Sequence, residues 1–430
     1  MATPVPENLF NNLWVLLSGA LVFLMTISVG LLEIGELGKA YQRGLLKTII
    51  IVCLAFFVMA FVGFNTAFAP CISGIIGNPL YSAPFLGGFS TDFPGILQGV
   101  WWSMGPNFFN TGVTLPTYYF FETAFASVTL ALVGVIALRK VKLSAFTAFS
   151  VVYFIVIWNL PAAWIWNPTG WLYNLGMRDF AGGLVVHGAA AAAGLAIVVR
   201  IWQEEKAKGL TESPRVPVNV SPGWIAIAIL LLWLGWFGFN PGSTLTWNHE
   251  ANVVVLTTFI AASTSFLSMM FFRWRETKEN PGLIYAANGI LMGLIVITPI
   301  AGFVSPASSV ILGAVSGPLY LSFEKVFGRM KWFTDPVGLF PGHLVGGLFG
   351  VTMIAFFTQA PYAAASGNGN LPNGIFFGGG LSALQQLGIE VFGILVVMLA
   401  VFALSSLVIW GIGKTMNGIT TDYRKEGLIP

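Results

Sequence analysis

The chain has 430 residues, of which 56% are hydrophobic and only 9% are charged, with a formal net charge of +3. A soluble domain carries about 25% charged residues, so this composition excludes a soluble protein and predicts an all-α protein that crosses a lipid bilayer many times. The two cysteines, Cys53 in an apolar stretch and Cys71 in a loop, give no disulfide framework.

Eleven apolar runs are long enough to span a bilayer as helices. Residues 1–12 lack the basic stretch of a signal peptide, so the run after them counts as the first span. The predicted spans are roughly 12–32, 48–68, 118–138, 143–162, 180–200, 222–240, 251–272, 282–300, 305–323, 337–358 and 386–412. The whole chain, 1–430, then forms one membrane domain with a short tail, 413–430.

The basic residues predict how the spans are oriented. With the N-terminus outside, 19 of the 20 lysines and arginines fall on the cytoplasmic side, and only Arg178 lies outside. This asymmetry is typical of membrane proteins, so we expect the N-terminus outside and the C-terminus inside. Because an extra span at 93–112 would destroy it, we expect the segment 69–117 to be an outer cap or a re-entrant loop. The glycine-rich stretch 367–380 is expected to be an outer turn.

A carboxylate and an imidazole recur at one spacing in two of the spans. Asp179 precedes His187 by eight residues, and Asp335 precedes His343 by eight residues. Eight residues of helix rise about 12 Å, which carries each imidazole near the centre of a hydrocarbon core about 30 Å thick. A lone imidazole on an apolar helix is often a buried packing residue, but two ionisable groups inside a membrane favour a functional site.

The two motifs lie on spans that run in opposite directions. The fifth span runs inward and the tenth runs outward, so both histidines reach the centre from opposite faces. This predicts an inverted repeat of five plus five helices, roughly 12–200 and 222–358, followed by one C-terminal helix. The pairs Gly182-Gly183 and Gly346-Gly347 allow the two helices to approach closely.

Four stretches, in order, resemble the ammonium transporter family, which groups ammonium transporters, methylammonium permeases and Rhesus proteins. They are Asp179-Phe-Ala-Gly-Gly-Leu-Val-Val-His187, Gly235-Trp-Phe-Gly-Phe-Asn-Pro-Gly-Ser243, Asn288-Gly-Ile-Leu-Met-Gly with Thr298-Pro299 and Gly302-Phe303, and Phe340-Pro-Gly-His343-Leu-Val-Gly-Gly347. The resemblance covers nearly the whole chain. It implies a homotrimer in the plasma membrane, the cytoplasmic membrane of a prokaryote, with a narrow apolar pore in each eleven-helix subunit.

The resemblance also implies roles for individual residues. The outer ammonium site would be Trp166 and Ser243 beside the structural carboxylate Asp179, the gate would be the stacked Phe125 and Phe239, and the proton relay would be His187 and His343. Each of the outer residues has an alternative interpretation. An aspartate can cap a helix, a tryptophan can belong to the interfacial belt, and a serine can bond to backbone.

The chemistry of ammonium agrees with these residues. A compact cation is attracted to an indole face by roughly 0.5–2 kcal/mol, which is far less than the cost of moving an unpaired ion into an apolar pore. We therefore expect the ion to give up its proton, cross as ammonia, and have its charge relayed along the imidazoles. The predicted protein is a transporter rather than an enzyme, with no cofactor, no metal and no nucleic-acid partner.

Three places depart from the family pattern. Glu33 and Glu36 are expected in a solvated inner loop. Glu122 stands where the family usually has glutamine, one turn before the gate phenylalanine, and either pairs with ammonium or lines the outer vestibule. The match to the conserved family tail begins at Glu426 and stops at Pro430, so we expect the part that docks a cytoplasmic nitrogen-signalling regulator, or a further signalling domain, to be missing.

Two other functions stay open at this point. The same scaffold could be an ammonium sensor that binds the ion and signals with little or no transport. A membrane metalloenzyme would need more ligands than two histidines, and the sequence has no His-Glu-x-x-His motif.

Overall fold

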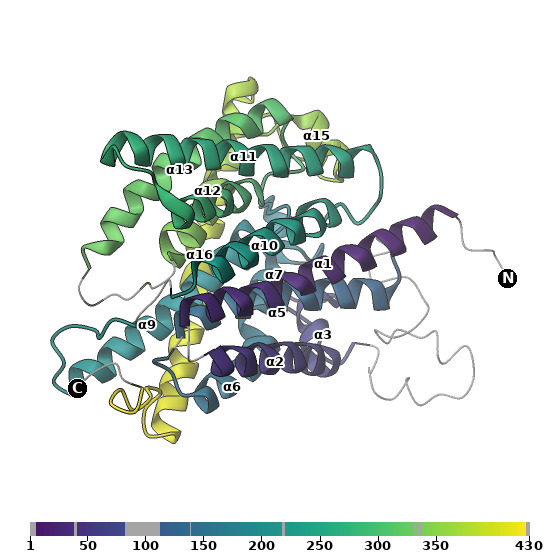
Figure 1. Cartoon of the computed structure of the whole chain (residues 1–430). Helices are drawn as coiled ribbons and strands as arrows, with labels where there is room; N and C mark the ends of the chain where they lie inside the picture. Colours follow the sequence, from purple (N-terminus) through teal and green to yellow (C-terminus); the bar gives the residue numbers. More distant parts are fainter. Residues whose placement is uncertain are drawn as a thin grey trace.

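Long apolar helices make up nearly all of the described structure. The computed structural model (Figure 1) describes residues 6–37, 41–81, 112–137, 139–216, 220–330, 332, 335 and 338–426. Residues 82–111, which hold nearly all of the segment 93–112, lie outside this range, so the expected outer cap there stays a prediction. Backbone polar groups have no water to bond inside a bilayer, which is why the apolar runs form helices.

The described residues of the first half of the chain form eleven helical elements and a small hairpin. The helical elements are α1 (Pro6–Leu37), α2 (Tyr41–Val58), η2 (Met59–Gly63), α3 (Phe64–Phe68), α5 (Leu115–Ala137), α6 (Leu143–Val152), η4 (Tyr153–Ile157), α7 (Asn159–Ile165), α8 (Trp171–Leu175), η5 (Gly183–Gly188) and α9 (Ala189–Ala207). The antiparallel hairpin joins β1 (Cys71–Ile72) to β2 (Ile76–Gly77). Several spans are interrupted by a π-helical turn, and η5 carries His187.

The second half again consists mainly of long helices, with one π-helical turn, η6, among its described residues. Its elements are α10 (Pro222–Gly242), α11 (His249–Thr277), α12 (Gly282–Ile297), α13 (Pro306–Gly328), η6 (Phe340–Leu344), α14 (Val345–Phe357), α15 (Ala360–Ala365), η7 (Ile375–Phe377) and α16 (Gly380–Thr415). Among the described residues, ten helical segments are long and apolar enough to cross a membrane, and the shorter apolar α12 is an eleventh. The all-α fold is confirmed, while the direction of insertion stays a prediction.

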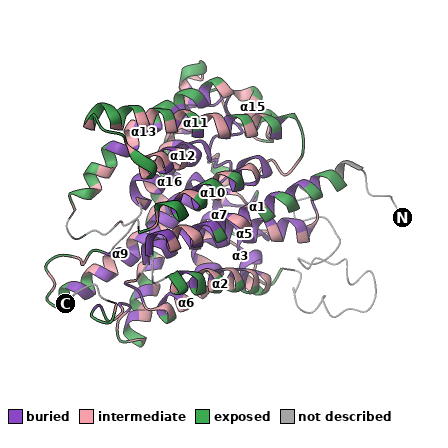
Figure 2. Cartoon of the chain, in the orientation of Figure 1, coloured by how far each residue is buried: buried purple, intermediate pink, exposed green. Residues whose placement is uncertain are grey.

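The two halves meet along α1 and α10. A Cβ atom on Gly238 of α10 would lie 2.6 Å from the main-chain oxygen of Ser18 in α1, so only glycine permits this approach. Small residues are the usual means of close helix packing in membranes. Figure 2 shows that the central helices, α5 above all, are buried, whereas α2, α11 and α13 present exposed residues to the outside.

One part of the bundle end that is predicted to face the cytoplasm, called the inner side below, differs from the sequence prediction. Glu33 and Glu36 are buried, only 2% and 4% exposed, because α1 continues to Leu37. The Nζ atom of Lys47 in α2 lies 2.6 Å from Glu33 Oε1 and 2.5 Å from the main-chain oxygen of Gly134 in α5. The expectation of a solvated loop was therefore wrong for both glutamates, and the buried ion pair ties three helices together.

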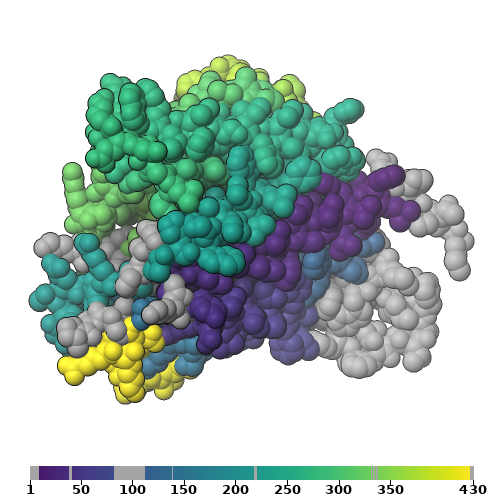
Figure 3. Space-filling model, in the orientation of Figure 1, coloured from purple at the N-terminus to yellow at the C-terminus, as the bar shows by residue number. Residues whose placement is uncertain are grey.

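The residues after α16 dock against the inner ends of other helices. Glu204 accepts from the main-chain N–H groups of Ile419 and Thr420 at 2.9–3.0 Å, and the Tyr423 hydroxyl donates to Glu205 Oε1 at 2.8 Å. Burial and the neighbouring Glu205 carboxylate raise the pKa of Tyr423 above its ordinary value, so the hydroxyl stays a donor. Figure 3 shows these C-terminal residues against the chain near α9, at the end of the bundle opposite the start of α1.

Candidate functional site

Both histidines lie on π-helical turns whose first N–H groups bond to an aspartate. The two carboxylate oxygens of Asp179 accept from the N–H groups of Gly182, Gly183, Leu184 and Val185 at 2.7–2.9 Å. Asp335 accepts in the same way from Leu339 and Phe340 at 2.9 and 2.8 Å. The recurring spacing in the sequence therefore corresponds to one local device, used twice: an aspartate that caps a turn and a histidine on that turn. Asp179 has the capping role that was one of its two interpretations.

The two imidazoles form a buried pair. His187 Nδ1 lies 3.0 Å from His343 Nδ1, and the ring centroids are 5.0 Å apart. Since a bond between two ring nitrogens needs one donor and one acceptor, the pair shares a single proton between its facing atoms. A Cβ atom on Gly347 would lie 2.3 Å from the main-chain oxygen of Gly183 and 3.1 Å from the His187 Cβ. The glycine pairs thus permit the approach of the two turns, as predicted.

A column of aromatic rings connects the histidine pair with the side of the bundle that is predicted to face outward, called the outer side below. The His187 ring is stacked on Phe239, with centroids 6.0 Å apart and an interplanar angle of 11°. The ring centroids of Phe239 and Phe125 are 4.4 Å apart. Phe125 and Trp166 are arranged edge to face, with ring centroids 5.7 Å apart. The order along the column is Trp166, Phe125, Phe239, His187 and His343. Trp166 directly follows α7, and the other four rings lie in α5, α10, η5 and η6.

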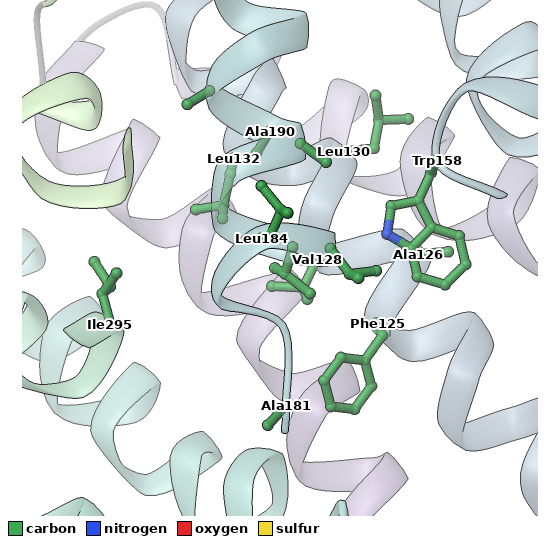
Figure 4. Packing of buried hydrophobic residues seen from close by; sticks show 14 of the residues in the cluster. Phe125, Ala126, Val128, Leu130, Leu132, Trp158, Ala181, Leu184, Ala190 and Ile295 are labelled. Atoms are coloured by element: carbon green, nitrogen blue, oxygen red, sulfur yellow. The ribbon is translucent and has the colours of Figure 1, made fainter. Parts of the chain in front are cut away.

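Apolar side chains seal this column from the sides. Figure 4 shows Phe125 and Val128 of α5 close to Ala181 and Leu184, which lie in the segment that leads to His187. Phe125 and Phe239 are at most 1% exposed. An ion that entered here would lose its hydration without finding a counter-charge, which is costly.

One outer cavity brings together the five residues expected to bind substrate. It has a volume of about 310 Å³, and its wall includes Glu122, Phe125, Trp166, Asp179 and Ser243. The Trp166 indole N–H donates to the main-chain oxygen of Asp179 at 2.7 Å, and Ser243 Oγ donates to the main-chain oxygen of Phe239 at 2.9 Å. Because the serine hydroxyl uses its hydrogen on the backbone, the lone pairs of its oxygen remain to accept a proton from a ligand.

Glu122 is the buried acid of this cavity. It is only 6% exposed, and its Oε2 atom has no hydrogen-bond partner among the described residues. Residues three apart on a helix lie on one face, so the carboxyl lies above Phe125. A buried carboxylate with a free oxygen at a cavity wall is suited to a small cation.

A small cavity lies on the other side of the pair. Its volume is about 30 Å³, and its wall includes His343, Asn288 and Tyr320 among otherwise mostly apolar residues. Phe125 and His343 therefore separate an outer cavity from an inner one. The third histidine, His249, is exposed at the start of α11 and takes no part. Within the described ranges, no group of three or more His, Cys, Asp or Glu residues is placed to hold a metal ion.

The sequence profile described as the Ammonium Transporter Family matches residues 13–428. The chain belongs to this family. It is therefore a multi-pass membrane protein from a family of transporters and not of enzymes. Membership of the family explains why the four motifs, including the two that carry the paired histidines, occur in this order in the sequence.

Relatives that are similar over most of their length come from several organisms. The chain is 30% identical to an ammonium transporter of Aquifex aeolicus, over 81% of this chain and 77% of the relative. It is 32% identical to ammonium transporter Amt1 of Archaeoglobus fulgidus, covering 79% of each. It is also 32% identical to ammonium transporter 1 of Dictyostelium discoideum, over 97% of this chain and 84% of the relative.

Solved structures share the fold. A protein described as a sensor Amt protein superposes with a TM-score of 0.81 at 24% identity, covering 98% of this chain and 97% of that one. Mep2 from Candida albicans superposes with a TM-score of 0.78, also at 24% identity, over 94% of this chain and 84% of that one. At this identity the likeness concerns the fold alone.

Some wall residues of the outer cavity had no signal in the sequence. Tyr118 and Arg178 contribute to its wall, as do Gly367 and Asn368 from the stretch expected to be a turn and Ser366 directly before it. The turn is present, since Gly367 adopts a positive φ of 80°. The cavity brings these residues together from segments far apart in the chain, which no local pattern could indicate.

Proposed function

We propose that this protein transports ammonium across the membrane, releasing the ion's proton on the way and passing ammonia through the aromatic column. The observation that carries the proposal is the His187–His343 pair, whose Nδ1 atoms are 3.0 Å apart below a column of aromatic rings. The names of the relatives, which are ammonium transporters, support this substrate.

Recruitment would take place in the outer cavity. Trp166 offers an aromatic face for a cation, an attraction worth about 0.5–2 kcal/mol, and the Ser243 oxygen can accept one ammonium proton. Asp179 is placed to support this site rather than to touch the ion, because its two carboxylate oxygens already accept four N–H groups. Its main-chain oxygen instead orients the Trp166 indole.

The charge and the nitrogen would separate at Phe125. Ammonium gives up one proton in the outer cavity, and neutral ammonia passes the gate of Phe125 and Phe239 without the cost of burying an ion. The proton passes along His187 and His343, which exchange donor and acceptor roles as it moves. Ammonia and the proton recombine on the inner side.

Glu122 would strengthen ammonium binding before this step. A carboxylate that meets a cation in a partly dry site adds about 1–3 kcal/mol, a factor of roughly 5–150 in affinity. Glu122 lines the same cavity as Trp166 and Ser243, and its Oε2 atom has no hydrogen-bond partner among the described residues. Tight binding of the ground state slows the passage that follows.

We further propose that the protein works as a homotrimer with one pore in each subunit. The bundle exposes large apolar side chains on several helices, including Leu13 of α1, Leu230 of α10 and Leu399 of α16, each at least 59% exposed. Such side chains face either lipid or a neighbouring subunit. A cytoplasmic regulator would bind on the inner side, where the residues after α16 dock.

The second candidate function is an ammonium sensor, favoured by the acid at Glu122. A site that holds ammonium tightly suits a receptor better than a fast channel. The likeness to a sensor Amt protein concerns the fold and does not choose between the two functions.

Paired measurements on purified protein separate the two candidates. Calorimetry reports ammonium binding, and proteoliposomes that enclose a pH-sensitive dye report flux down an ammonium gradient. A transporter gives flux without any added effector. Saturable binding with no flux would assign the protein to the sensors.

A further inference from the structure

The last long helix reaches into the support of the outer cavity through two side chains. Glu390 Oε1 on α16 accepts from the main-chain N–H of Arg178 at 3.1 Å. Gln386, one turn earlier on the same helix, donates from Nε2 to Glu390 Oε1 at 2.7 Å and to the main-chain oxygen of Gly176 at 3.0 Å. The segment 176–180, which contains Asp179, is thus hydrogen-bonded to α16. The partners are 210 residues apart in the chain for Gly176 and Gln386, and 212 residues apart for Arg178 and Glu390.

Packing fixes the same segment from two sides. A Cβ atom on Gly393 of α16 would lie 2.1 Å from the Met177 Sδ, so the methionine fills a notch that only glycine leaves open. On the opposite side, the main-chain N–H of Phe180 donates to the Pro299 oxygen at 3.0 Å. The segment 176–180 is held as a strap between α16 and the chain after α12.

The strap carries the atom that orients the outer tryptophan. The main-chain oxygen of Asp179 accepts the Trp166 indole N–H at 2.7 Å, and Arg178 and Asp179 both line the outer cavity. A displacement of the strap therefore moves the indole face and the cap of the His187 turn together. The route from α16 to Trp166 consists of two hydrogen bonds between a side chain and the main chain, joined by the backbone of Arg178 and Asp179.

A carboxyl group in this place needs an explanation. Glu390 is fully buried, at 0% exposure, and no other Asp, Glu, Lys or Arg occurs in α16 before Lys414. Ionisable residues inside membrane helices are costly and are normally functional. The Oε2 atom of Glu390 has no hydrogen-bond partner among the described residues. Both hydrogen bonds of the carboxyl group, from Arg178 and Gln386, are therefore made by Oε1.

We propose that Glu390 is a positioning residue for the outer ammonium site, acting as the acceptor that holds the strap 176–180 and through it Trp166. This inference rests on the proposed function for the identity of the ion. It assigns no contact between Glu390 and the substrate. It predicts that the role depends on the acceptor oxygen at Oε1 and not on the charge.

Two substitutions separate acceptor from charge. Glu390→Gln keeps an oxygen that can accept from Arg178 N–H and Gln386 Nε2, while Glu390→Leu keeps similar bulk without any acceptor. Ser405→Ala is the matched control, because Ser405 is fully buried on the same helix and its hydroxyl has no partner among the described residues. Gln386→Leu is a milder second variant, since it removes only the bond to Gly176 and the support of Glu390.

The readout is the ammonium dependence of flux into proteoliposomes, together with thermal unfolding of each variant in detergent. We expect Glu390→Leu to raise the ammonium concentration at half-maximal flux by about fivefold or more, the factor for a lost buried hydrogen bond, with the maximal flux changed much less. Gln386→Leu should also raise the ammonium concentration at half-maximal flux. In Glu390→Gln and Ser405→Ala this concentration should stay within about twofold of the wild-type value.

Two outcomes would overturn the inference. One is an unchanged half-maximal concentration in a folded Glu390→Leu variant, or in Gln386→Leu if the leucine variant does not fold. The other is a Glu390→Gln variant as impaired as Glu390→Leu, which would make the charge the important property. Absence of flux in the wild type would instead contradict the proposed function, and the two failures are therefore distinct.

Discussion

The Nδ1 atoms of His187 and His343 lie 3.0 Å apart although the residues are 156 positions apart in the chain. Each imidazole is placed by the same local device, a π-helical turn whose N–H groups are bonded to an aspartate eight residues upstream. The contact between them is made possible by Gly347, which lies directly against the backbone of Gly183. The pair is thus a product of two similar segments that meet without intervening side chains.

The close contact at Gly347 gives the first prediction. Gly347→Ala should reduce flux at least about tenfold, because its Cβ would lie 2.3 Å from the Gly183 oxygen and a small misplacement of reacting groups is costly. Gly388→Ala is the control, since nothing lies within 4 Å of a Cβ at that exposed site on α16. Equal flux in the two variants would show that the spacing of the imidazoles is unimportant.

The second prediction concerns Glu122. Glu122→Gln should weaken ammonium binding by roughly 5–150-fold in calorimetry, and it should leave conduction equal or faster because release is easier. Glu279→Gln, in an exposed inner loop, is the charge-matched control. Unaltered binding in Glu122→Gln would leave the carboxyl as a plain part of the vestibule wall.

The third prediction concerns the cap of the His187 turn. Asp179→Asn keeps one acceptor oxygen and leaves two of the four N–H groups without a partner, which costs about 1–3 kcal/mol for each. Thermal unfolding should occur at a lower temperature, and amide hydrogen exchange at residues 182–185 should speed up. Asp422→Asn, at an exposed turn in the tail, should change neither, and a matching loss there would mean that the effect is not local.

The sequence predicted the fold because each span is an apolar run, and the orientation indicated by the basic residues stays a prediction. Some spans are longer than predicted, since helices such as α1 and α11 continue past their apolar stretch, whereas α12 ends at Ile297, before the predicted end at residue 300. Glu33 was misplaced for the same reason. A glutamate near the end of an apolar run resembles a loop residue, and nothing local shows that Lys47 lies opposite it in the next helix.

The site was predictable only where a short motif contains it. The spacing of Asp179 and His187 indicated the deep imidazole, and the family motifs indicated Phe125 and Phe239, whose ring centroids lie 4.4 Å apart. The π-helical form of both turns could not be foreseen from helical periodicity. Glu390 carried a signal, as a lone acid in an apolar span, but its partner segment 176–178 is distant in the chain, so its role required the structure.

The fourth prediction concerns assembly. The exposed leucines of α1, α10 and α16 should be covered in part by neighbouring subunits, so native mass spectrometry in mild detergent should find a trimer. Replacing exposed leucines at a subunit contact by charged residues should release smaller species, because buried unpaired charge is strongly disfavoured. A wild-type protein that is monomeric across several detergents would contradict the trimer.

The central claim is tested most directly by the current that ammonium evokes across a planar membrane formed with proteoliposomes. Wild type should give a saturable current with ammonium and none with potassium. Ammonium can release a proton and cross the apolar column as ammonia, whereas potassium has no proton to release. His187→Ala and His343→Ala should each abolish it, and the double variant should add little, because residues that act as one unit are not additive. A full current in either single variant, or additive partial losses, would contradict a shared relay.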